Sequence, residues 1–130
     1  MGEILQGSKF EKDFIERTYA SIVSDMSIAF SELVANSWDA GATSVSITLP
    51  DKKGGFVVIE DNGTGMTDSE FQQRWMTIAY NRVAHQGEFI EYNSSKGKAK
   101  RLAYGRNGVG RHSMLCFDSC YQVETWRDGK

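Results

Sequence analysis

The feature that most constrains this chain is a row of polar side chains, Glu32, Asn36 and Asp39, within an otherwise apolar segment. Their spacing places all three on one stripe of an α-helix, and we expect that helix over about residues 24–38, with Gly41 ending it. Polar groups on a largely buried helix need partners, because burying them unpaired costs free energy. Caps to neighbouring loops or buried water are the commoner explanation of an isolated E-x-x-x-N, so its interpretation depends on the rest of the chain.

Length and composition indicate one small domain. The chain has 130 residues, of which 40% are hydrophobic and 25% charged, so we expect a single globular domain over residues 1–130. No apolar run is long enough for a signal peptide or a membrane span, which predicts a cytoplasmic protein without membrane contact. Cys116 and Cys120 lack metal-ligand spacing, so free thiols are favoured over a disulfide or a zinc site.

The periodicity changes after the first helix. Residues 44–49 alternate between polar and apolar, which predicts a strand with one face in the core. Residues 56–60 predict a second strand, too apolar for a solvated edge, and the turn signals at 50–55 join the two as a hairpin.

Later elements are indicated by caps and turn signals. Capping-box patterns at residues 8–11 and 67–70 each predict the start of a helix. Residues 109–117 can be helical, and 121–126 have the composition of a strand. The Asp-Gly pair at 128–129 is a hairpin-turn signal.

Residues 81–107 show no convincing period and are rich in Gly, Ser, Asn and Lys. A structureless connection of this length usually has a function, so we expect a lid or a binding loop. No Asp or Glu occurs between Tyr92 and Phe117, where the cationic side chains are Lys96, Lys98, Lys100, Arg101, Arg106 and Arg111. Such a segment facing an acidic helix suits a magnesium-bound polyphosphate, and nucleic acid bound by residues 96–111 is the competing interpretation.

Two further motifs are weak alone. Gly105, Gly108 and Gly110 precede a possible helix, so the backbone can approach a phosphate closely, although the order of glycines is not the dinucleotide fingerprint. Asp61 follows a strand and precedes Asn-Gly, where a turn-forming Asp is the commoner explanation. As an acceptor in a pocket it would bind the exocyclic amine of adenine and repel the carbonyl of guanine.

Together these motifs resemble the GHKL superfamily of ATP-binding domains, named for gyrase, the ninety-kilodalton heat-shock chaperone, histidine kinases and MutL. The residues that carry the resemblance, in the family's order, are Glu32 to Asn36 with Asp39 to Thr43, Asp61-x-Gly63-x-Gly65, and Gly105-x-x-Gly108-x-Gly110 with Ser113. The resemblance implies an α/β (α+β) fold, a two-layer Bergerat-type sandwich with helices on one face of a mixed, mostly antiparallel sheet. Family domains continue for several more strands, so this chain looks like the N-terminal part of such a domain.

The resemblance also implies roles at the matching positions. Glu32 would be the general base, Asn36 would hold Mg²⁺, Asp39 would support the site and Asp61 would bind adenine. The remaining expected contacts to the base and phosphates of ATP are Gly63, Gly65, Met66, Gly105, Gly108, Val109, Gly110 and Ser113. The lid at residues 81–107 would close over the nucleotide.

The function that this resemblance implies is a magnesium-dependent ATPase module of a larger clamp or chaperone-like protein. The Asp39-Ala-Gly-Ala-Thr43 extension looks closer to the MutL and chaperone branches than to sensor kinases. We expect ATP and Mg²⁺ as cofactors, homodimerisation of the full-length protein, and nucleic acid as a partner through a larger assembly. Two alternatives stay open: a nucleotide-gated binding module without turnover, and a nucleic-acid-binding domain that uses residues 96–111.

Overall fold

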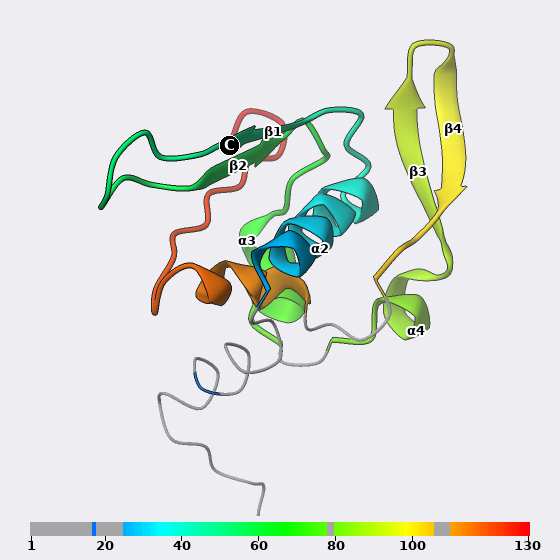
Figure 1. Cartoon of the computed structure of the whole chain (residues 1–130). Coiled ribbons are helices and arrows are strands. Elements are labelled where there is room, and N and C mark those ends of the chain that lie inside the picture. The colour runs from blue at the N-terminus through cyan, green and yellow to red at the C-terminus, as the bar shows by residue number, and fades with distance from the viewer. Residues whose placement is uncertain (1–16, 18–24, 78–79, 106–109) are drawn as a thin grey trace, which may run out of the picture.

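The architecture is α+β, as the sequence predicted (Figure 1). The computed structural model describes residues 17, 25–77, 80–105 and 110–130; residues 8–11, expected to open a helix, lie outside these ranges. The helices are α2 (Met26–Asp39), α3 (Asp68–Glu70), the π-helix η1 (Phe71–Trp75), α4 (Arg82–Gln86) and the 3-10 helix η2 (Gly110–Cys116). The strands are β1 (Val45–Thr48), β2 (Val58–Asp61), β3 (Phe89–Ser94) and β4 (Gly97–Leu102).

Helix α2 is the central element. It begins after Asp25, whose side chain accepts a hydrogen bond from the Ser27 amide at 2.7 Å and so caps the helix. It ends at Ala40, and Gly41 follows with a φ of +77°, a value that favours glycine at a helix stop. The prediction of a helix here, with Gly41 as its stop, is confirmed.

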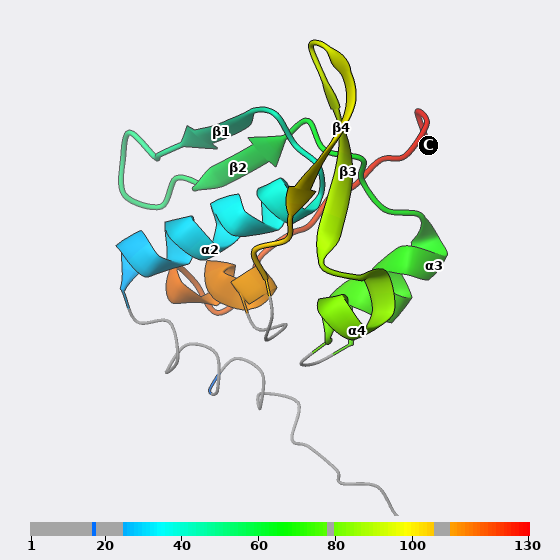
Figure 2. The same cartoon turned by 90° about the vertical axis from the view of Figure 1, so that its right-hand side faces the viewer.

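Strands β1 and β2 form the expected antiparallel hairpin, in register from Val45 opposite Asp61 to Thr48 opposite Val58. The hairpin lies over one side of α2, and η2 packs against another side of the same helix (Figure 2). The expectation that the second strand avoids a solvated edge is wrong: Phe56 is 83% exposed and Val58 40%. Within the described ranges β2 pairs with β1 alone, so its other edge has no neighbouring strand.

The capping box at residues 67–70 is confirmed. Thr67 Oγ1 accepts a hydrogen bond from the Glu70 amide at 3.2 Å, and Glu70 Oε2 accepts one from the Thr67 amide at 3.0 Å. The helix that starts there is α3, which continues directly as η1. Its aromatic side chains Phe71 and Trp75 stack with centroids 6.2 Å apart.

The expectation of a structureless connection at residues 81–107 is wrong for the part that the structure describes. Asn81 caps α4 through the Ala84 amide at 3.0 Å, and β3 and β4 form a second antiparallel hairpin. This hairpin projects from the body of the molecule in both views (Figures 1 and 2). Ile90 is the buried anchor at its base, with 5% of its surface exposed. The interpretation of residues 81–107 as a lid stays a prediction.

The segment after η2 differs from the predicted strand. Residues 121–126 have no strand partner among the described residues; instead Thr125 Oγ1 accepts a hydrogen bond from the Met66 amide at 2.9 Å. The Asp-Gly turn signal is confirmed, because Arg127 and Lys130 exchange backbone hydrogen bonds of 2.9 and 3.0 Å. Asp128 and Gly129 both have positive φ, as that turn requires.

The buried apolar side chains form a small core beneath α2 and at the base of the β3–β4 hairpin. In the part of the chain that the structure describes, they are Ala29, Leu33, Ala35, Ala42, Ile90 and Ala103. Among the described helices, none combines the length and apolar character that crossing a membrane requires.

Candidate functional site

Glu32 brings the first motif into contact with the glycine segment. A Cβ atom added to Gly110 would collide with Glu32 Oε2 and would lie 3.3 Å from Glu32 Cβ. A side chain at position 110 would therefore require the Glu32 carboxylate to move away from the start of η2. Glu32 itself is partly exposed, so its carboxylate lies at the edge of this contact rather than in the core.

Asn36 lies one turn further along the same stripe of α2. Its Nδ2 atom is buried and has no hydrogen-bond partner among the described residues. Ser113 on η2 is 1% exposed, and its Oγ atom is in the same condition. Buried polar atoms are almost always paired in native proteins, so these two positions suit a polar ligand or water.

Asp39 holds the segment that leads from β4 to the glycines. Its Oδ1 accepts a hydrogen bond from the Tyr104 amide and its Oδ2 accepts one from the Gly105 amide, both at 2.7 Å. A Cβ on Gly105 would lie 2.8 Å from Asp39 Oδ2, closer than real Cβ contacts allow. The carboxylate therefore supports the glycine segment through its backbone.

Asp61 ends β2, and its carboxylate is held from both sides. Oδ2 accepts a hydrogen bond from Ser37 Oγ at 2.9 Å, and Oδ1 accepts one from the Gly63 amide at 2.8 Å. Asp61 is solvent-exposed rather than enclosed in a pocket, and among the described residues no strand lies beside the other edge of β2. Sequence reasoning missed Ser37, which is 3% exposed; its one signal is its position directly after Asn36 in the motif.

The turn after Asp61 lies against the end of α2. The Thr64 amide donates to the Ala40 carbonyl at 2.8 Å. A Cβ on Gly63 would lie 2.7 Å from the same carbonyl, so this approach requires glycine. The Asp61–Gly65 motif thus packs against α2, the helix that carries Glu32, Asn36 and Asp39.

The far side of this turn lies against the C-terminal segment. Gly65 has a φ of +66°, and a Cβ added there would collide with the Trp126 carbonyl. Met66 donates its amide to Thr125, as described above. The sequence motif predicted the importance of Gly65 but gave no sign that residues 125–126 contact it.

Arg101 is a second residue whose role was not predicted, because the sequence analysis treated it only as one of six cations in the basic segment. Its guanidinium lies 3.8 Å from the centroid of the Trp38 ring and 4.4 Å from that of Tyr92. It donates to the carbonyls of Trp38 and Ala42, both at 2.7 Å, where the end of α2 favours a positive charge. Arg101 therefore joins β4 to α2.

Other members of the basic segment also have protein partners. Arg111 donates to the Thr77 carbonyl, and Lys100 lies 3.5 Å from Glu91 on the projecting hairpin. Gly108 and Val109, expected to contact phosphates, lie outside the described residues.

An apolar hollow beside α2 does not coincide with the polar stripe. Its volume is about 430 Å³, and its lining residues are Phe30, Ser31, Val34, Ala35, Trp38 and Tyr104. No charged side chain lines it, so it does not suit a polyphosphate. The residues of the second and third motifs instead contact α2: Asp61 bonds to Ser37, Gly105 bonds to Asp39, and Gly110 lies against Glu32.

His112 is a buried residue of η2 whose ring lies near those of Trp75 and Tyr121. Burial, together with the nearby charge of Arg111, lowers the pKa of His112 from 6.5 to about 4. Its Nδ1 lies 2.5 Å from the Tyr121 hydroxyl, which can donate to the neutral ring. The folded chain therefore holds this histidine uncharged at neutral pH.

This lowered pKa predicts acid sensitivity. The unfolded chain binds the proton more readily than the folded one between pH 6.5 and 4, so the contribution of His112 is complete above pH 6.5 and is lost as the pH falls through this window. Denaturant unfolding at pH 7.5 and 4.5 should show a loss of up to about 3 kcal/mol from this group. Between pH 7.5 and 4.5, the His112→Gln variant should lose less stability than the unaltered chain does, and the difference should equal the contribution of His112. An equal loss in both proteins would contradict the prediction.

Comparisons with known proteins agree with the sequence motifs. The family described as histidine kinase-, DNA gyrase B-, and HSP90-like ATPase matches residues 23–130. The chain is 46% identical over 99 residues to the mismatch repair endonuclease pms1 of Dictyostelium discoideum, an alignment that covers 76% of this chain and 9% of that protein. It is 33% identical over 98 residues to the putative type II restriction enzyme HgiDII of Herpetosiphon aurantiacus, covering 75% of this chain and 14% of that protein.

A shorter alignment reaches the human protein named mismatch repair endonuclease PMS2, with 39% identity over 51 residues, covering 39% of this chain and 6% of that protein. The chain thus spans only a small part of the length of these relatives. No solved structure matches it.

Proposed function

Since this chain belongs to the family of histidine kinase-, DNA gyrase B- and HSP90-like ATPases, the GHKL superfamily, we propose that it binds ATP with Mg²⁺ and hydrolyses it with Glu32 as general base. The observation that carries the proposal is the contact of Glu32 with Gly110, with the unpaired side-chain nitrogen of Asn36 one turn further along α2. A proton acceptor and a polar ligand position then lie on one stripe of α2, and the glycine that begins η2 contacts the first of them.

In this proposal Glu32 takes a proton from the water that attacks the γ-phosphorus of ATP. The bond between that phosphorus and the bridging oxygen breaks, and ADP leaves with the bonding electrons. Phosphoryl transfer needs mainly positioning and charge stabilisation. We propose that the phosphates are bound by the backbone at Gly105 and Gly110 and by the Ser113 hydroxyl. Gly108 and Val109, which lie outside the described residues, are part of the same proposal.

The donor set fits magnesium. No group of three or more Asp, Glu, His or Cys is clustered in the part of the chain that the structure describes, so an all-protein metal cage is not available there. Magnesium usually takes one or two protein oxygens and completes its shell with water and phosphate oxygens. Asn36 can supply one such oxygen, since a half-turn of its unpaired amide exchanges the nitrogen and oxygen positions. Bound magnesium would neutralise charge on the phosphates.

Asp61 is the group we propose for the adenine amine. An ionised carboxylate has about four lone-pair positions, and Ser37 and the Gly63 amide engage one on each oxygen. Acceptor capacity therefore remains for the amine, with the orientation of the carboxylate already fixed. Gly65 and Met66 would line the base, and Asp39 would support the site by holding the glycine segment.

Calorimetric titration of the 130-residue chain with ATP and GTP, in the presence of magnesium, tests this function. We expect ATP to bind with a Kd in the micromolar to millimolar range and GTP at least about tenfold more weakly, because the guanine carbonyl would face a carboxylate. Equal affinities, or binding of neither nucleotide, would contradict the proposal.

The relatives extend the proposal to a larger protein. Two of them are named for DNA mismatch repair and a third for restriction, so we propose that this chain is the ATPase module of a DNA-processing protein. Closure of residues 81–107 over ATP and dimerisation of the full-length protein are parts of the same proposal.

A further inference from the structure

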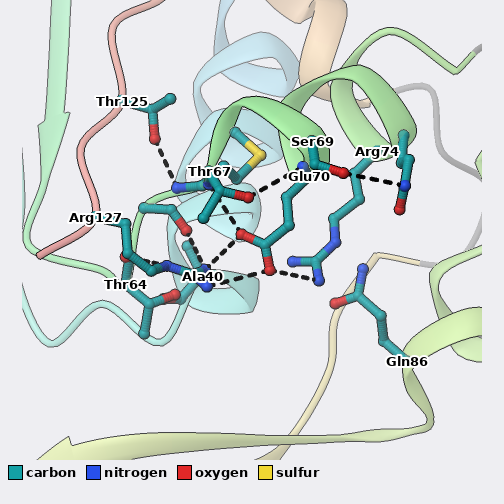
Figure 3. A network of polar contacts seen from close by, with 12 residues as sticks. Ala40, Thr64, Thr67, Ser69, Glu70, Arg74, Gln86, Thr125 and Arg127 are labelled. Atoms are coloured by element: carbon teal, nitrogen blue, oxygen red, sulfur yellow. Dashed lines mark hydrogen bonds and ion pairs between the residues drawn. The ribbon is translucent and has the colours of Figure 1, made fainter. Parts of the chain in front are cut away.

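Arg127 makes contacts that its place near the C-terminus does not suggest (Figure 3). Its Nε donates to the Thr64 carbonyl at 3.2 Å, and its Nη2 donates to the Gly65 carbonyl at 2.7 Å. These carbonyls belong to the turn between Asp61 and Met66. One guanidinium therefore binds two consecutive peptide groups of the proposed base-binding turn.

The same guanidinium is held by a carboxylate. Arg127 Nη1 lies 3.1 Å from Glu70 Oε1 and Nη2 lies 2.9 Å from Glu70 Oε2. Glu70, which also belongs to the capping box at the start of α3, forms a second ion pair with Arg74 at 2.9 Å (Figure 3). Burial alone would raise the pKa of Glu70, but the Thr67 amide and the two arginine charges lower it, so the carboxylate is ionised at neutral pH.

The backbone on both sides of this ion pair is fixed. The turn closed by the two hydrogen bonds between Arg127 and Lys130 follows it directly. Just before it, the Trp126 carbonyl lies against Gly65, and Thr125 accepts the Met66 amide. Residues 125 and 126, directly before Arg127, thus contact the same Asp61–Met66 turn that the Arg127 side chain binds.

We infer that Arg127 is a positioning residue that fixes the Asp61–Met66 turn in the conformation that recognises the adenine base. The inference rests on the proposed function, since it assumes that this turn contacts the base. Arginine suits the role because its planar fork can bind two carbonyls and a carboxylate at once, whereas lysine offers a single compact charge. Arg127 acts through the backbone, so it is expected to affect recognition of the base and not of the phosphates.

Arg74 provides a matched control. It pairs with the same carboxylate at the same distance, yet none of the contacts described for it reaches the turn. Replacing either arginine by glutamine removes one of the two positive charges that pair with the Glu70 carboxylate. Only the Arg127→Gln variant also removes the hydrogen bonds to Thr64 and Gly65.

Amide hydrogen exchange on the nucleotide-free chain tests the structural half of the inference. We expect the Thr64 and Met66 amides to exchange about tenfold faster in Arg127→Gln, with less than a twofold change in Arg74→Gln. Arg127→Lys should restore less than half of the lost protection. Unchanged exchange in Arg127→Gln, or an equal effect of the Arg74 variant, would overturn the inference.

Calorimetry with two ligands tests the other half. Arg127→Gln should weaken ATP about tenfold and inorganic tripolyphosphate, which has no base, less than twofold, while Arg74→Gln changes neither by more than about twofold. Equal weakening of both ligands in Arg127→Gln would mean general destabilisation and would overturn the role in base recognition. If the unaltered chain bound no ATP, the proposed function would fail and with it this role, whereas the exchange experiment would still decide whether Arg127 fixes the turn.

Discussion

Replacing Glu32 by glutamine is expected to lower ATP turnover by about 10²- to 10⁴-fold while leaving the affinity for ATP within a factor of about two. Glutamine has nearly the same shape, so it can keep the packing of this side chain on Gly110. It cannot accept the proton of the attacking water at neutral pH. Phosphate release at saturating ATP measures the first quantity, and calorimetric titration measures the second.

The matched control is Glu60→Gln on β2, which removes an equal charge from an exposed strand position opposite Ser46. Its turnover should stay within about twofold of the unaltered chain, because surface charges far from a reaction contribute little. Turnover that survives in Glu32→Gln would exclude Glu32 as the base.

These two measurements, together with a DNA-binding assay, separate the alternative functions. A chain that binds ATP but shows no turnover even with Glu32 intact is a nucleotide-gated binding module. Salt-dependent binding of DNA without any binding of ATP would favour the nucleic-acid-binding alternative, in which Lys96, Lys98 and Lys100 of the projecting hairpin would contact phosphates.

Local signals made α2 and its motif predictable. The polar stripe, the apolar neighbours and Gly41 all act within one helix, so a sequence window contains the whole pattern. The capping box at residues 67–70 and the Asp-Gly turn at 128–129 are local in the same sense. Each of these features was confirmed where it was expected.

The second hairpin was missed because only some of its inward side chains are apolar. In β4 the positions that alternate toward the body include Ala99 and Arg101, and Arg101 is accommodated there by the rings of Trp38 and Tyr92. Hydropathy counts an arginine as a surface residue, whereas stacking on aromatic faces and bonds to helix carbonyls can pair its charge. That arrangement depends on α2, which is distant in the sequence.

The opposite error occurred at residues 121–126. The segment has strand composition, but a strand also needs a partner with free backbone groups, and the described residues provide none beside it. For the site, helical spacing predicted that Glu32, Asn36 and Asp39 share one stripe, and the family resemblance added Asp61 to this group. The polar contacts of Ser37 and Arg127 to the second motif depend on tertiary packing. The only sequence signal for Ser37 is its position directly after Asn36, and Arg127 has none.

Replacing Asp61 by asparagine is expected to weaken ATP binding by about a hundredfold and to reduce or reverse the preference for ATP over GTP. The carboxylate oxygen that would accept the adenine amine becomes an amide nitrogen, which repels the amine and can donate to the guanine carbonyl. Calorimetric titration of the variant with ATP and with GTP measures both effects.

The local structure can tolerate this change, so lost binding would not reflect unfolding. The asparagine oxygen can still accept the Gly63 amide. Its nitrogen can donate to Ser37 Oγ, which then keeps its own hydrogen for the Leu33 carbonyl, 3.3 Å away in the present structure. We expect the unfolding temperature to change by only a few degrees, because two charge-assisted hydrogen bonds become neutral ones but both are kept.

Ser37→Ala is the informative companion to Asp61→Asn. It removes one donor that orients the carboxylate but leaves the carboxylate itself, so ATP should bind only a few-fold more weakly and the preference over GTP should persist. If the two variants lost ATP equally, orientation by Ser37 and not acceptance of the amine would explain the selectivity. If Asp61→Asn bound ATP as the unaltered chain does, the base would have to lie elsewhere, because no other described carboxylate combines the end of β2 with a contact to α2.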